Sequence, residues 1–93
     1  TGTWFASGTV TMYDTSGSAT FDVKLWDGTT VIASTRVFSS FANTAMTASL
    51  SGQLASPAGN LRISVKDLTS TNGLILNGIA GNNSSTITAI RVA

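Results

Sequence analysis

The segment ATFDVKLW, residues 19–26, alternates apolar and polar side chains along almost its whole length. Alternation with a period of two is typical of a β-strand that buries one face and exposes the other. The side chains expected to face the core are Ala19, Phe21, Val23 and Leu25. The dipeptide Asp27-Gly28 follows directly and predicts a tight hairpin, because both central positions of the favoured turn need a positive φ.

The same period continues outward in both directions from this strand. Further strands are predicted at residues 4–13, 29–36, 45–51, 61–66, 74–76 and 85–92. Residues 37–43 interrupt the alternation and are interpreted as a crossing connection with two aromatic plugs, Phe38 and Phe41. The apolar run 74–76 suits a strand covered on both faces, and residues 52–60 around Pro57 are predicted to form a loop.

Seven or eight short strands without a helical window predict an all-β fold. We expect a single small antiparallel β-sandwich, jelly-roll-like, that spans residues 1–93. The first residue is Thr1 and not Met, which suggests a processed chain or the C-terminal part of a longer chain.

The composition excludes much chemistry. The chain has no His and no Cys, all four of its acidic residues are Asp, and charged residues make up 10% of it, against about 25% in an ordinary domain. It therefore lacks an imidazole base, a thiolate nucleophile and the usual zinc ligands. A glycosidase could draw its two carboxylates only from those four Asp. We expect no catalytic residues and no cofactor.

Three of the aspartates are candidates for chemistry: Asp14, Asp22 and Asp67. Residues 14–18, Asp-Thr-Ser-Gly-Ser, resemble half of a calcium loop, but the bidentate Glu is missing, so a hairpin turn is favoured and no metal is expected. Asp22 and Asp67 could in principle form a carboxylate pair if their strands adjoin. Neighbouring lysines favour ordinary solvated or paired charges for both.

Net charge and hydropathy argue against nucleic acid and a membrane as partners. A net charge of +1 offers no basic patch for nucleic acid. The sequence contains no run of 18 or more apolar residues, so no membrane-spanning helix is predicted.

Aromatic side chains are the other candidates for function. An outward-facing aromatic can contact a second subunit or provide a stacking platform for a sugar, and Trp26 could do either. The candidate subunit contacts are Trp4, Phe5, Tyr13, Trp26, Phe38 and Phe41. Strand faces rich in Thr and Ser with little charge resemble the cores of subunit interfaces, so a closed homo-oligomer is favoured.

Two polar loops, Thr69–Gly73 and Gly78–Ser84, are candidates for ligand contact. Their asparagines, together with Trp26 or Tyr13, would provide the hydrogen bonds and the stacking surface of a carbohydrate-binding module. The candidate loop residues are Asn72, Asn77, Asn82 and Asn83.

Several blocks of the sequence resemble a known family. The blocks are Gly2-Thr3-Trp4, Ser7 to Val10, Ala19 to Phe21, Lys24 to Ser34 (KLWDGTTVIAS) and Ser85 to Arg91 (STITAIR). Together they look like the carboxy-terminal β-sandwich of tailed-bacteriophage virion proteins, which occurs in head decorations, head fibres and tail fibres.

The resemblance implies a small jelly roll, similar in outline to the trimeric heads of the tumour necrosis factor class. It implies a virion location on the capsid or tail surface, contacts with other virion proteins and no enzymatic activity. A homotrimeric display domain is therefore the first hypothesis, and a carbohydrate- or receptor-binding module that recognises a host surface glycan is the alternative. Both are compatible with one fibre tip.

Overall fold

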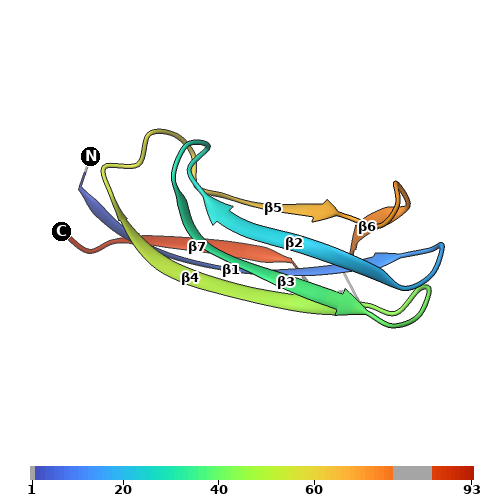
Figure 1. The fold of residues 1–93 in the computed structure, drawn as a ribbon. Coiled ribbons are helices and arrows are strands. Elements are labelled where there is room, and N and C mark those ends of the chain that lie inside the picture. The colour runs from blue at the N-terminus through green and yellow to red at the C-terminus, as the bar shows by residue number, and fades with distance from the viewer. Residues whose placement is uncertain (1, 77–84) are drawn as a thin grey trace.

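A computed structural model describes residues 2–76 and 85–93 of the chain (Figure 1). Within these residues the fold contains only strands. They are β1 (Thr3–Asp14), β2 (Ala19–Trp26), β3 (Val31–Ser39), β4 (Met46–Ala55), β5 (Arg62–Asp67), β6 (Gly73–Leu76) and β7 (Thr86–Arg91). None of the described residues belongs to a helix that could cross a membrane.

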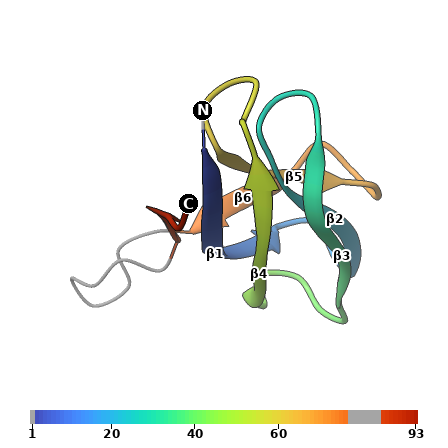
Figure 2. The ribbon, with the colours of Figure 1, turned by 90° about the vertical axis from the view of Figure 1, so that its left-hand side faces the viewer.

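The strands form two antiparallel sheets that pack on each other (Figures 1 and 2). In sheet A, the long strand β1 pairs with β4 on one side and with β7 and β6 on the other. In sheet B, β2 lies between β3 and β5. The small antiparallel β-sandwich predicted from the sequence is confirmed, and its seven described strands fall within the expected number.

The core lies between the two central strands, β1 and β2. Every second residue of β2 is buried, as its alternation predicted, and Phe21 and Leu25 are among the largest fully buried side chains. Ala6, Val10 and Met12 of β1 face them from sheet A. Burial of apolar surface at this interface is the main source of stability for the fold.

Small residues in sheet A leave room for side chains from sheet B. Gly52 of β4 lies opposite Ala6 of β1. A Cβ atom at Gly52 would collide with the side chain of Ile32, which packs against the core. The glycine thus allows β3 and β4 to approach each other at one edge of the sandwich, where Figure 2 shows them side by side.

The other edge of the sandwich is open. Ile75 of β6 and Ile87 of β7 share the inward face of sheet A with Met12 and Gly8, yet they are 54% and 41% exposed. A cavity of about 250 Å³ lies here between Val10, β5 and these two strands. The prediction that residues 74–76 are covered on both faces is therefore wrong for Ile75, which sheet B does not cover. It is also wrong for Leu74, which lies opposite Tyr13 on the outer side of sheet A and is 47% exposed.

The aromatic plugs predicted for residues 37–43 are also absent. β3 continues to Ser39, and Phe38 and Phe41 are 57% and 73% exposed. The buried hydroxyl of Ser39 donates hydrogen bonds to the carbonyls of Phe41 and Thr44, at 3.2 and 2.9 Å. A polar side chain thus closes this turn, and the phenyl rings remain outside.

The turn after β2 differs in detail from the predicted two-residue hairpin. Residues 27–30 form the connection, the register shifts between Leu25 and Trp26, and Gly28 has a φ of 95° whereas Asp27 has no positive φ. The carboxylate of Asp27 stabilises this longer turn by accepting hydrogen bonds from the backbone N–H groups of Thr29 and Thr30. The predicted loop at 52–60 is shorter than expected, since β4 extends to Ala55.

Candidate functional site

The outer face of sheet B collects polar and charged side chains from three strands. Directly opposed residues of antiparallel strands point to the same face, so the register fixes its composition. Its three rows are Arg36, Asp22 and Lys66; Ser34, Lys24 and Ser64; and Val31, Trp26 and Arg62. We call this surface the sheet B face.

The sheet B face holds most of the charge of the protein. Four of the five Lys and Arg residues lie on it, with a single carboxylate, Asp22. The fifth cation, Arg91, lies on β7 of the other sheet. A chain with a net charge of only +1 thus has one clearly positive face.

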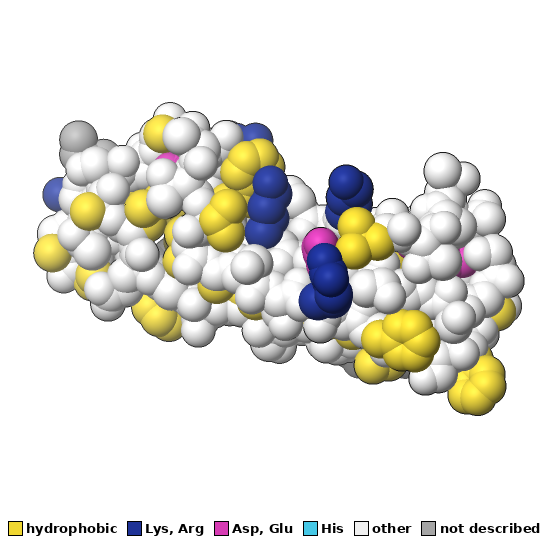
Figure 3. All heavy atoms as spheres, viewed as in Figure 1, with side chains coloured by type: hydrophobic (Ala, Val, Ile, Leu, Met, Phe, Trp, Pro, Cys, Tyr) yellow, Lys and Arg dark blue, Asp and Glu magenta, His cyan; other side chains and the backbone are white. Residues whose placement is uncertain are grey.

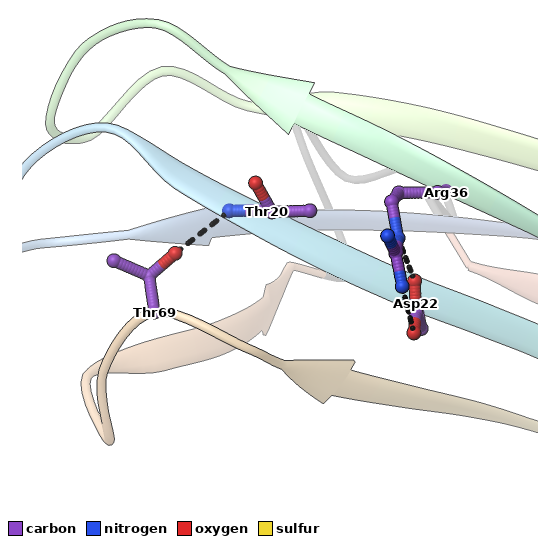
Figure 4. Close-up of polar contacts among 4 residues, drawn as sticks. All are labelled: Thr20, Asp22, Arg36 and Thr69. Carbon is purple, nitrogen blue, oxygen red and sulfur yellow. Dashed lines mark hydrogen bonds and ion pairs between the residues drawn. The ribbon is translucent and has the colours of Figure 1, made fainter.

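Asp22 and Arg36 form a bidentate ion pair across β2 and β3 (Figure 4). Arg36 Nε and Nη2 donate to the two carboxylate oxygens at 2.6 and 3.0 Å. These hydrogen bonds and the nearby charge of Lys66 hold the pKa of Asp22 below its ordinary value, and the pair raises the pKa of Arg36. Paired bonds of this kind fix the plane of a guanidinium group.

Trp26 supports two cations on this face. Lys24 Nζ lies 3.5 Å from the centroid of the indole ring, and the guanidinium carbon of Arg62 lies 5.6 Å from it. The indole Nε1–H donates to Ser64 Oγ at 2.9 Å. Such cation–π contacts stabilise charged groups near an aromatic face. The ring is half-buried, and Lys24 covers the surface on which a sugar would stack.

The middle of the sheet B face is hollow. A depression of about 590 Å³ is lined by residues of all three strands, among them Lys24, Arg36, Ser64 and Lys66. Figure 3 shows Lys and Arg side chains gathered around a hollow in this view. The volume falls within the range of about 300–1,000 Å³ that is usual for small-ligand sites.

The outer face of sheet A is the opposite in character, and we call it the sheet A face. Its described positions on β1, β4 and β7 carry no charged residue. Its apolar members include Phe5 and, directly opposite, Ile90, which are 38% and 59% exposed. Its hydroxyl residues are Thr3, Ser7, Thr9, Thr11, Thr47, Ser49, Ser51, Thr86 and Thr88.

The hydroxyls of the sheet A face satisfy one another in part. Thr11 Oγ1 lies 3.0 Å from Thr47 Oγ1, and Thr9 Oγ1 lies 3.4 Å from Ser49 Oγ. A shallow depression of about 290 Å³ runs between Ser7, Ser51 and the start of β7. This surface can therefore be covered without stranding an ion in a dry interface.

The six candidate aromatics do not form one surface. Phe5 and Tyr13 lie on the sheet A face, whereas Trp26 and Phe38 lie on the outer side of sheet B. Trp4 is half-buried, lies on the inner side of sheet A and lines a cavity together with Pro57. Phe41 is exposed in the turn after β3. Periodicity placed each side chain on a face of its own strand, but the assignment of strands to sheets separated them.

The candidate ligand loops do not meet Trp26. Asn72 is exposed in the loop after β5. Its backbone N–H donates a hydrogen bond to Ser70 Oγ, and its backbone carbonyl accepts one from Thr15 N–H. This loop lies at the beginning of β2, where Thr69 Oγ1 accepts a bond from Thr20 N–H (Figure 4), and Trp26 is at the other end of that strand. The remaining loop candidates, Asn77, Asn82 and Asn83, lie outside the described residues.

The candidate carboxylate pair, Asp22 and Asp67, does not form, although β2 and β5 are neighbours. Asp22 points outward from sheet B, while Asp67 lies opposite Phe21 on the inner side, so these two do not meet. Asp67 instead neighbours Asp14, which is fully buried. The Oδ2 atom of Asp67 is buried and has no hydrogen-bond partner among the described residues.

Asp14 closes the turn that connects β1 of sheet A to β2 of sheet B. Hydrogen bonds with the Asp67 carboxyl and from Ser16 and Ser70 hold the pKa of Asp14 well below its usual range. The Ser16 N–H lies 2.7 Å from Oδ1, and the Ser70 hydroxyl lies 2.6 Å from Oδ2. The hairpin predicted for residues 14–18 is therefore wrong: the segment is a tight polar turn, but β1 and β2 do not pair, because it carries the chain from sheet A to sheet B. Among residues 2–76 and 85–93, no three metal-ligating side chains of the Asp, Glu, His or Cys types come together.

Comparison of the chain with protein-family models, with curated proteins and with solved structures finds no match. The site therefore stands on its geometry. The sequence contained one signal for it, since Lys24, Arg62 and Lys66 all fall on the polar side of an alternating strand. Only the register of β2 with β3 and β5 brings them together.

Proposed function

We propose that this chain is a non-enzymatic structural and display domain of a bacteriophage virion, assembled as a homotrimer in a capsid decoration or a fibre head. The observation that carries the proposal is the sheet A face, which has no charged residue at its described positions and exposes Phe5 and Ile90. The resemblance of residues 24–34 to virion β-sandwich domains supports the location on the capsid or tail surface.

Physical reasons favour assembly through this face. Cores of subunit interfaces are depleted in charged residues, because an ion buried without a partner is costly. Exposed strand edges and apolar patches favour self-association, and β6 and β7 provide both at the open edge of the sandwich. A second and third copy of the chain would cover the sheet A face with no charge to neutralise at its described positions.

The mass in solution tests the proposal. Native mass measurement at micromolar concentration is expected to give three times the 9.5 kDa of one chain. Ser51→Glu places a charge on an exposed position of the sheet A face and should yield monomers, because the carboxylate would lose its hydration in the interface. Thr71→Glu adds the same charge in an exposed loop and should leave the trimer intact.

Binding to particles completes the test. The purified domain should bind virions that lack it, through contacts with other virion proteins. A monomer of 9.5 kDa that binds no particle would contradict the proposal.

The second candidate function is a carbohydrate- or receptor-binding module. The hollow on the sheet B face favours it, because the depression combines hydroxyls and cations in one concave surface, and one of these cations, Lys24, lies over the indole of Trp26. The two functions are compatible, since they use opposite faces of the sandwich. Loss of glycan binding in Trp26→Ala, with the fold intact, would support the second function, and retained binding would argue against a role for Trp26.

A further inference from the structure

We infer that the sheet B face binds an acidic oligosaccharide, whose carboxylates are held by Lys24, Lys66, Arg62 and Arg36. This inference rests on the carbohydrate-binding function proposed above and specifies the class of sugar. It follows from the charge, the spacing and the shape of the face.

The charge of the face is not balanced within the protein. Asp22 is the only carboxylate in its three rows, against four cations. Arg36 uses Nε and one Nη2 proton for Asp22, so its Nη1 group keeps its donors for another acceptor. Its side chain is 65% exposed. An anionic ligand would pair with the cations that Asp22 leaves unbalanced.

The cations are prearranged along the strands. Arg62 and Lys66 are four residues apart on β5, which corresponds to roughly 13 Å. Lys24, on the adjacent strand, lies in the row between them and is held over the Trp26 ring. Cations spaced in a series match repeated acid groups on a linear chain better than one small anion. Contacts that hold them in place reduce the entropy lost on binding.

The lining suits a sugar. The hydroxyls of Ser34 and Ser64 flank Lys24 on both sides, and both residues line the depression of about 590 Å³. Hydroxyls of this kind can exchange hydrogen bonds with sugar hydroxyls. Phe38, 57% exposed and two residues from Arg36, adds an apolar surface at one end of the face.

Nucleic acid fits the same face less well. Single strands are bound by stacking bases on open aromatic rings, and Lys24 covers the ring of Trp26. Domains that bind nucleic acid commonly have a pI above about 9, whereas this sequence has a pI near 8.2. A short oligonucleotide therefore serves as the competing probe.

Calorimetric titration with defined oligomers tests the inference. The probes are tetragalacturonate, a tetramer of sialic acid, the carboxyl-reduced form of tetragalacturonate and tetrathymidylate. At least one acidic tetramer should bind, and it should bind at least about tenfold more tightly than the neutral reduced oligomer, as expected for a charge-assisted hydrogen bond. Its affinity should decrease as the salt concentration rises.

Charge variants locate the site. The double variant Lys24→Gln/Lys66→Gln should weaken binding of the acidic tetramer by at least about tenfold. Arg91→Gln removes one cation from the other sheet and should leave the affinity within about twofold, because long-range effects are screened. Circular dichroism and thermal unfolding of each variant verify that the fold is intact.

Each contrary outcome has a distinct meaning. Equal affinity for the acidic and the reduced oligomer would overturn the acidic specificity and leave the carbohydrate-binding function standing. Failure of both acidic tetramers and the reduced oligomer to bind at millimolar concentration would overturn both. Tighter binding of tetrathymidylate would replace the sugar by nucleic acid. An equal loss of affinity in Arg91→Gln would show that net charge, and not this face, determines binding.

Discussion

Asp27 shows how a single side chain organises one end of the sandwich. Its Oδ1 atom accepts hydrogen bonds from Thr29 and Thr30 N–H at 2.8 and 2.6 Å, and its Oδ2 atom accepts one from Ala58 N–H at 2.8 Å. Only 3% of the residue is exposed. Backbone donors of Thr30, Ala58 and Thr29 lower the pKa of Asp27, so the carboxylate joins the β2–β3 turn to the loop after β4.

Asp27→Ala is expected to lower Tm by more than about 5 °C, because three backbone N–H groups lose their acceptor and stay poorly hydrated. Asp27→Asn keeps one carbonyl oxygen and should have a smaller effect. Thr29→Ala retains the backbone donor and serves as the control. Thermal unfolding followed by circular dichroism measures all three, and equal Tm values for Asp27→Ala and Thr29→Ala would contradict this role.

At the level of elements, β2 and β3 differ in how reliably alternation indicates burial. β2 is the central strand of sheet B, and its inward residues are buried as predicted. β3 is an edge strand, so few neighbours cover it, and Phe38 projects from the outer side. Two phenylalanines in paired strands therefore have opposite environments, although both lie in apolar positions of the sequence.

Phe21→Ala should reduce the free energy of unfolding by about 3–5 kcal/mol, because a fully buried ring leaves a cavity between the sheets. Phe38→Ala should reduce it by less than about 1 kcal/mol, since the ring is mostly exposed. Urea unfolding of both variants at one pH provides the comparison. A large effect at Phe38 would mean that this ring is covered, as the plug interpretation required.

The whole molecule is a thin sandwich with two unlike faces. The sheet A face has no charge at its described positions, and the sheet B face holds four of the five cations. The long axis measures 44 Å and the short axis 16 Å, so each face is broad relative to the volume of the core. The proposed trimer uses the first of these faces, and the proposed acidic ligand uses the second.

Acid should destabilise the whole molecule. Asp14, Asp22 and Asp27 have folded-state pKa values below the ordinary value of 3.8. The folded state therefore binds fewer protons than the unfolded state, and this contribution to stability is fully present above about pH 5 and is lost as the pH decreases through and below 4. With no His in the chain, no side-chain transition of this kind is expected between about pH 5 and 8.

Urea unfolding at pH 7, 5 and 3 measures this dependence. Similar free energies at the first two values and a clear decrease at the third are expected. A free energy at pH 3 equal to or above that at pH 7 would contradict the stabilising role of the three carboxylates.

The sequence by itself determined the strand architecture, the buried side of β2 and the scarcity of charge. These features are local, because alternation and turn residues act over a few neighbouring positions. The tertiary structure decided which strands share a sheet, and thereby placed Lys24, Arg36 and Lys66 on one face while separating Trp26 from Asn72. Register depends on contacts between distant segments, and a slip of one residue would turn every side chain of a strand to the other face. For that reason the strands could be predicted from the sequence, whereas the site could not.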